Sequence, residues 1–236
     1  MRELVRATVG VLRQRFTSVI VVTIAISLPG QILIEGARGS SPISREISLG
    51  GQLLTNAANL TLVLILLRNL QSKPLPRGSI VPSVVTALLR LFGVLMILVV
   101  PTIVVVLPLA LIFTFLQGEA AAATIVMAGT IVLEVIFAPI ALIVPVSLNE
   151  DIPRPWPILK RAWAMSRPRR GQTRLFLGGL AVLTLGASEL VRAFGPAPSA
   201  AVVLVYLVSG VLNAGVIAVL YHSLIGEELT IAAHPN

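Results

Sequence analysis

The chain has 236 residues, of which 56% are hydrophobic and 12% are charged, whereas a soluble domain averages about 25% charged residues. So few charges cannot cover a globular surface in water, which excludes an ordinary soluble domain and predicts a single membrane domain over residues 1–236. The chain contains no cysteine, which excludes thiol catalysis, disulfides and cysteine-ligated metals. The net charge of +8 raises nucleic acid as a partner. The cations lie at the ends of apolar runs, however, so membrane topology and anionic lipid explain them better, and no nucleic acid is expected.

Residues 1–16 predict an amphipathic helix that lies in the membrane interface. One face carries apolar residues at helical spacing and another carries arginines: Leu4, Val5, Val11 and Leu12 on the first, Arg2, Arg6 and Arg13 on the second. The alternative is the start of a signal peptide. No convincing small-x-small cleavage site follows, so we expect the segment to be retained.

Six apolar runs are long enough to cross a hydrocarbon core about 30 Å thick. They cover residues 16–34, 51–67, 92–116, 121–146, 175–194 and 200–225. Pro29-Gly30 is expected to kink or end the first run, and residues 35–50 read as a loop rich in Gly and Ser. Residues 81–91 predict a short entry helix. The fold class is therefore all-α: a polytopic integral membrane protein with six transmembrane helices arranged as three hairpins, together with interfacial amphipathic helices.

The longest polar interruption, residues 145–176, separates the fourth and fifth runs and carries seven cations. Most of the other Lys and Arg residues fall on the same predicted side, and the opposite side holds only Arg38, Arg45 and Arg192. This asymmetry predicts that both termini are cytoplasmic, in a bacterial inner (plasma) membrane or another energy-coupling membrane.

Within this interruption, Trp156, Leu159 and Trp163 share one face of a predicted interfacial helix, and tryptophan is common at the headgroup boundary. Two interpretations stay open: contact with anionic lipid headgroups, and docking of a protein partner with the tryptophans as anchors. The candidate contact residues are Arg154, Trp156, Lys160, Arg161, Trp163, Arg167, Arg169 and Arg170.

The chain also reads as three repeats of one unit, an interfacial helix followed by a hairpin, at about 1–71, 78–150 and 155–228. Arg90-Leu91-Phe92 and Arg174-Leu175-Phe176 open corresponding runs. The alternative is three hairpins without shared ancestry. In either case each hairpin can insert alone and then pack through small residues and polar contacts.

The fourth run ends in Glu150-Asp151, followed by Ile158-Leu159-Lys160-Arg161-Ala162-Trp163-Ala164-Met165. The sixth run ends in Val219-Leu220-Tyr221-His222-Ser223-Leu224. In this pattern the chain resembles the membrane domain of glycerophosphoryl diester phosphodiesterases and related YciC-like six-span bacterial proteins. Ala162 and Met165 depart from the serine and leucine that those families prefer. The resemblance implies a membrane module connected with membrane organisation, lipid handling or export, without the soluble catalytic barrel.

Polar residues inside the runs are the other candidates: Glu134, Asn56, Asn59 and Asn213. A carboxylate at mid-membrane depth is costly unless it is paired or protonated, so Glu134 is a candidate for a proton or cation relay. No Lys or Arg lies in a run core to pair with it, which favours the alternative that an asparagine binds it as structural glue. His222 is either a pigment or haem ligand or, as we favour, an interfacial hydrogen-bonding group.

The sequence has no Walker A, GxSxG or HExxH pattern and no cluster of zinc ligands. We therefore expect no enzyme activity, no catalytic residue, no metal and no cofactor. The leading hypothesis is an accessory or scaffold module that contacts anionic lipid and packs against itself or other membrane subunits. The alternative is a permease-like component of a transport or export system, which a polar, water-accessible cavity at the depth of Glu134 would favour. A lipid-modifying enzyme is a third hypothesis.

Overall fold

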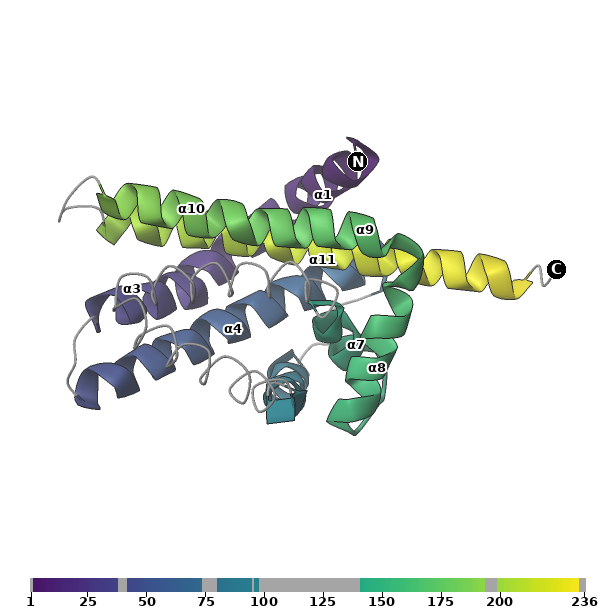
Figure 1. Cartoon of the computed structure of the whole chain (residues 1–236), viewed down its shortest axis with the longest axis horizontal. Coiled ribbons are helices and arrows are strands. Elements are labelled where there is room, and N and C mark those ends of the chain that lie inside the picture. Colours follow the sequence, from purple (N-terminus) through teal and green to yellow (C-terminus); the bar gives the residue numbers. More distant parts are fainter. Residues whose placement is uncertain are drawn as a thin grey trace, which may run out of the picture.

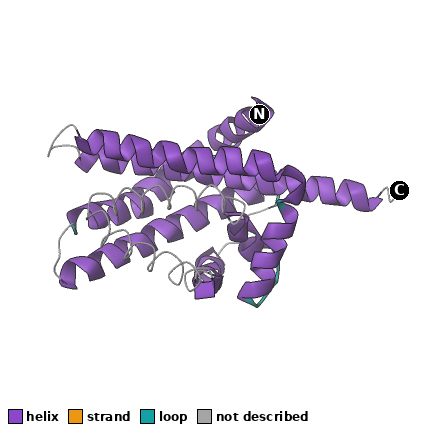
Figure 2. Cartoon of the chain, in the orientation of Figure 1, coloured by secondary structure: helices purple, strands orange, loops and turns teal. Residues whose placement is uncertain are grey.

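The computed structural model describes residues 2–37, 42–73, 80–94, 96–97, 141–193 and 199–233. Every regular element within these ranges is a helix, and no strand occurs among them (Figure 2), which confirms the all-α part of the prediction. Three helices are long and apolar enough to cross a membrane: Phe16–Gly36, Ile43–Leu70 and Ala200–Gly226. Residues 98–140, with Glu134 and most of the third and fourth predicted spans, lie outside the described residues. The count of six spans stays a prediction.

The first span is one continuous helix built from α2 (Phe16–Val22), a π-helical turn (Thr23–Ser27) and α3 (Leu28–Gly36). It does not end at Pro29-Gly30, as one sequence interpretation allowed. Proline has no N–H to donate, and its ring crowds the carbonyl four residues earlier. That carbonyl belongs to Ala25, inside the wider π turn, which accommodates the ring and lets the helix continue to Gly36.

The second span, α4 (Pro42–Leu70), begins about nine residues before its predicted start, so the prediction of a loop over residues 42–50 was wrong. Just past the predicted loop, α4 packs closely on α3 through two glycines. A Cβ on Gly51 would lie 2.6 Å from the Gly30 carbonyl oxygen, and a Cβ on Gly30 would lie 2.8 Å from the Gly51 carbonyl oxygen. The two backbones touch at this crossing, which only glycine permits.

The core lies where the second half of α4 meets the second half of α11 (Ser199–Ala233). Every residue of α4 from Leu62 to Leu67 is buried, so this part of the helix is apolar all round and enclosed all round. Ala218, Leu220 and Tyr221 of α11 are equally enclosed. The outer faces of the spans keep large apolar side chains exposed, among them Ile24, Ile32, Leu53, Leu204 and Val208, as expected for surfaces that face lipid.

Four further helices pack around this pair (Figure 1). They are α1 (Arg2–Gln14), α7 (Ile143–Asn149), α8 (Pro155–Met165) and α10 (Gly179–Ala193). Helix α10 runs antiparallel beside α11, and α1 packs on α11, where a Cβ on Gly215 would meet the Thr8 methyl group at 2.9 Å. Helix α1 therefore buries Thr8 and Val11 and docks on the bundle, in addition to any contact with the interface.

The basic segments that the sequence assigned to one side of the membrane meet at one end of the bundle. The Arg15 Nε donates to the Asn69 Oδ1 at 2.8 Å, which joins the start of the first span to the end of α4. Arg169 donates to the Ser223 hydroxyl at 3.0 Å, in the second half of α11. Helices α7, α8 and α9 (Arg170–Thr173) lie at this same end, whereas α3 meets the start of α4 at the other (Figure 1).

Candidate functional site

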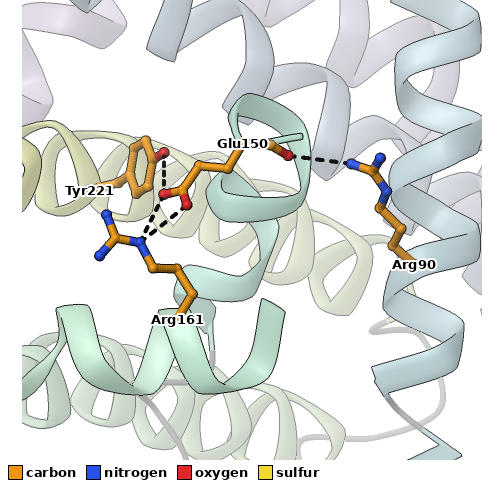
Figure 3. A network of polar contacts seen from close by, with 4 residues as sticks. All are labelled: Arg90, Glu150, Arg161 and Tyr221. Carbon is orange, nitrogen blue, oxygen red and sulfur yellow. Dashed lines mark hydrogen bonds and ion pairs between the residues drawn. The ribbon is translucent and has the colours of Figure 1, made fainter. Parts of the chain in front are cut away.

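A polar network centred on Glu150 organises the basic end of the bundle (Figure 3). Glu150 follows α7, at the point where the chain leaves the helix for an extended segment. Its carboxylate accepts a bond from the Arg161 Nε at 3.1 Å and from the Tyr221 hydroxyl at 3.3 Å. Tyr221 is fully enclosed. The carboxylate thus links the neighbouring helices α7 and α8 to α11, which is distant in the sequence.

Arg90 holds the other side of the same turn. It lies on the helix Ile80–Val94 and donates to the backbone carbonyl oxygens of Ser147 at 2.9 Å and of Glu150 at 3.5 Å. The Ser147 carbonyl belongs to the last turn of α7, where no helical N–H remains to bind it, and the Glu150 carbonyl, just after α7, also accepts from the Ile152 N–H at 2.9 Å. Arg90 also pairs with Asp151 at 3.5 Å, but the Asp151 side chain is fully exposed, so the carbonyl contacts carry most of the restraint.

The surface of α8 presents the predicted basic residues to solvent. Arg154, Lys160 and Arg167 are exposed, and Trp156 is 61% exposed. Trp163 is half-buried, with the Arg170 guanidinium 4.6 Å from its ring centroid. The eight predicted contact residues therefore divide into two sets. Arg154, Trp156, Lys160 and Arg167 form an outer surface, and Arg161, Trp163, Arg169 and Arg170 make contacts within the protein.

The face of α8 that packs on the bundle is not the tryptophan face. Ile158, Ala162 and Met165 are buried at spacings of four and three, whereas Trp156 points outward. A helix at the membrane boundary can carry two apolar faces, one for the protein and one for lipid. The small Ala162, a departure from the serine of the resembling families, lies on the protein face.

An amphipathic groove of about 540 Å³ opens beside this basic end, between α1, the π-helical turn Arg174–Gly178 and α11. Its apolar wall includes Leu4, Leu70, Phe176 and Leu220, and its polar rim includes Arg169, Gln172, His222 and Ser223. His222 is exposed at this rim. Among the described residues, no group of three or more His, Asp or Glu side chains is placed to hold a metal ion.

A second, smaller cavity of about 260 Å³ lies between the helices of the bundle and is open on one side. It joins two of the predicted intramembrane polar residues, Asn59 of α4 and Asn213 of α11. The third, Asn56, is exposed on α4, and Glu134 lies outside the described residues. The sequence interpretation missed the remaining polar residues of the wall, which are Ser27, Gln31, Thr55, Thr184, Tyr206 and Ser209.

The sequence does carry a signal for this wall. Ser27 and Gln31 are four residues apart, as are Thr55 and Asn59. Polar residues at this spacing share one face of a helix. In a span that is otherwise apolar, such a pair indicates an inward polar stripe rather than an isolated interruption.

The described residues thus form a helical bundle in which three helices are long and apolar enough to cross a membrane, with a basic end and a polar cavity between the helices. Comparisons with family models, with curated proteins and with solved structures found no match to this chain. The resemblance to the phosphodiesterase membrane domain and the YciC-like proteins stays a prediction, as do the three internal repeats.

Proposed function

We propose that the chain is a non-enzymatic integral membrane module that binds anionic lipid at its basic end and packs there against itself or other membrane subunits. The observation that carries this proposal is an amphipathic groove at the same end of the bundle as the exposed cations. Its apolar wall suits acyl chains, although Glu3 and Arg169 both lie at its polar rim. The exposed Arg154, Lys160 and Arg167 suit headgroup phosphates. In the proposed topology this end is cytoplasmic, and the membrane is a bacterial plasma membrane.

The charge part of the proposal is tested by removing the outer cations. Replacing Arg154, Lys160 and Arg167 by Gln together leaves the Glu150 network intact, because all three are exposed. A cation near an anionic leaflet contributes about 1 kcal/mol of attraction, so the triple variant should lose most of its preference for anionic lipid. The measurement is native mass spectrometry of protein released from nanodiscs that contain equal amounts of phosphatidylglycerol and phosphatidylcholine.

Arg45→Gln is the control, because Arg45 lies at the opposite end of the bundle, on α4 near its start. It should retain the wild-type lipid ratio. Equal enrichment of phosphatidylglycerol in the triple variant and in the wild type would refute the role of the basic surface.

The groove is tested separately by filling it without changing charge. Ala7→Phe places a ring in the groove that Ala7 lines, and should reduce the number of retained lipids. Val9→Phe is the matched control, because Val9 is 56% exposed on α1 and lines no part of this groove. If both variants retain as much lipid as the wild type, the groove is not the lipid site.

A second candidate function, a permease-like component of a transport system, is favoured by the polar cavity among the spans. Uptake of a radiolabelled solute into proteoliposomes is the direct test. Glycerol is a suitable first probe, since the described residues that line the cavity are uncharged. Uptake at the rate of protein-free liposomes would count against transport of this class of solute.

A further inference from the structure

The inner cavity has walls suited to hydrogen bonding and unsuited to ions. Eight of the eleven described residues that line it carry a hydrogen-bonding side chain: Ser27, Gln31, Thr55, Asn59, Thr184, Tyr206, Ser209 and Asn213. None of the eleven is Asp, Glu, Lys, Arg or His. Gln31 and Ser27 are each only 6% exposed. The wall therefore offers amide and hydroxyl groups, which both donate and accept, and no fixed charge.

Three of these side chains lie near the middle of helices that are long and apolar enough to cross a membrane. Ser27 is near the middle of the helix Phe16–Gly36, Asn59 is near the middle of Ile43–Leu70, and Asn213 is near the middle of Ala200–Gly226. No bulk water reaches a polar group at this depth from the lipid side. The Thr55 hydroxyl is buried without a hydrogen-bond partner in the part of the chain that the structure describes. Buried polar groups that line such a cavity are satisfied by bound water or by a polar ligand.

Glycine keeps the cavity open. A Cβ on Gly210 would come within 3.2 Å of the Asn59 Oδ1, so a larger residue there would press on the wall. The volume of about 260 Å³ is just below the range of about 300–1,000 Å³ that is typical for drug-sized ligands. It is much larger than one water molecule requires. The size therefore points to a small solute.

We propose that this cavity binds a small neutral polyol. Each hydroxyl of such a compound both donates and accepts, which matches the amide and hydroxyl groups of the wall. An ion would give up its hydration in a low-dielectric site without meeting an opposite charge. The proposal does not depend on lipid binding at the basic end, because the cavity and the basic groove share no lining residue. It concerns occupancy, and holds whether or not the solute crosses the membrane.

The chain has no cysteine, so a single introduced thiol reports on the cavity. Ser209→Cys replaces one wall residue by a side chain of similar shape. Val208→Cys is the matched control, because its neighbour Val208 is 51% exposed on the lipid-facing side of α11 and lines no cavity described above. The probes are three methanethiosulfonate reagents in proteoliposomes: neutral hydroxyethyl, cationic trimethylammonioethyl and anionic sulfonatoethyl.

Only a thiolate reacts, and a thiol in lipid stays protonated, so we expect the neutral reagent to label Ser209→Cys at least ~10-fold faster than Val208→Cys. Each labelling rate is first divided by the rate at which the same reagent labels a free thiol in water. On this scale, the two charged reagents should label Ser209→Cys at least ~10-fold more slowly than the neutral reagent. Molar glycerol should slow the neutral labelling severalfold, and an equal concentration of choline chloride should not.

Three results would each overturn the proposal. Labelling no faster than in Val208→Cys means a dry cavity. Equal normalised rates for neutral and charged reagents mean an aqueous route open to ions. Neutral labelling that glycerol does not slow means that the cavity holds water but no polyol. If Ser209→Cys does not fold, Ser27→Cys on the opposite wall gives the same comparison.

Discussion

The crossing of α3 and α4 makes the sharpest stability prediction, because two glycines at the contact bring backbone against backbone. The change is Gly51→Ala. Its Cβ would lie 2.6 Å from the Gly30 carbonyl oxygen, 2.8 Å from the Ile34 Cγ1 and 3.0 Å from the Ile34 nitrogen. Rotating the Ile34 side chain relieves only one of these contacts. The other two involve backbone, so the helices themselves must move apart.

The size of the effect follows from the shift that is needed. An ordinary Cβ contact begins at 3.4 Å, so the Gly30 carbonyl oxygen at 2.6 Å must move away by about 0.8 Å. Moving the two helices apart by about 0.5–1 Å loses a quarter to a half of the dispersion attraction in the other contacts between them. Overpacking of a tight contact costs about 1–3 kcal/mol. We expect Gly51→Ala to lower the free energy of unfolding by this amount, as measured by denaturant titration in mixed micelles.

Gly50→Ala is the matched control, because it makes the same chemical change one residue away on the same helix. A Cβ at Gly50 meets nothing within 4 Å, and alanine in a helix is about 0.5–1 kcal/mol better than glycine. Gly50→Ala should therefore be stabilising or neutral. If Gly51→Ala is as stable as Gly50→Ala, the close crossing is wrong.

Three further changes have defined outcomes. Glu150→Gln removes the charge that binds Arg161. It should lower the free energy of unfolding by about 1–2 kcal/mol, because the ion pair is only partly exposed. The control Asp151→Asn changes a fully exposed side chain and should alter the free energy of unfolding little in the same denaturant titration. Gly215→Ala brings a Cβ to 2.9 Å from the Thr8 side chain and should loosen α1, seen as faster limited proteolysis near the N-terminus; unchanged proteolysis would contradict the packing of α1 on α11. Ser72→Gly relieves a positive φ of 53° at the end of α4 and should raise thermal stability by about 1 kcal/mol.

The apolar spans were the most predictable part of the fold, because length and hydropathy alone decide whether a helix can cross a bilayer. The start of α4 and the continuation past Pro29 were not predictable in this way. Both depend on contacts between residues distant in sequence or on a local π turn. The serines and Gly50 of residues 42–50 are typical of a loop, and the close contact with α3 is made at Gly51, outside the predicted loop.

The polar residues show the same division. The sequence grouped Asn56 with Asn59 and Asn213, but only the last two line the cavity. Each residue turns a helix by about 100°, so Asn56 is only about 60° from Asn59, close enough to share a face with it. Spacing therefore does not separate the asparagine that lines the cavity from the exposed one. It also does not show that Thr55 and Asn59 face Gln31 on another helix.

Counting charges along the sequence predicts which segments form the basic end, but not the role of each cation there. Counting Lys and Arg placed the segments on one side, and Arg15, Arg90 and Arg169 now tie those segments to one end of the bundle. Counting does not separate cations that face solvent from those that bind within the protein. Arg161 and Lys160 are neighbours in sequence, yet one binds Glu150 and the other is exposed.

The glycine crossing and the polar cavity depend on each other. Thr55 belongs to both features: its hydroxyl lies 2.7 Å from where a Cβ on Gly30 would be, and it lines the cavity. Gln31, which follows Gly30 in the sequence, lines the cavity as well. The distance between α3 and α4 at Gly51 therefore sets the width of the cavity one turn further along. Gly51→Ala in the Ser209→Cys background should raise the labelling rate by the charged reagents relative to the neutral one, because a wider cavity admits hydrated ions. A lower stability with unchanged selectivity would mean that the crossing and the cavity are independent.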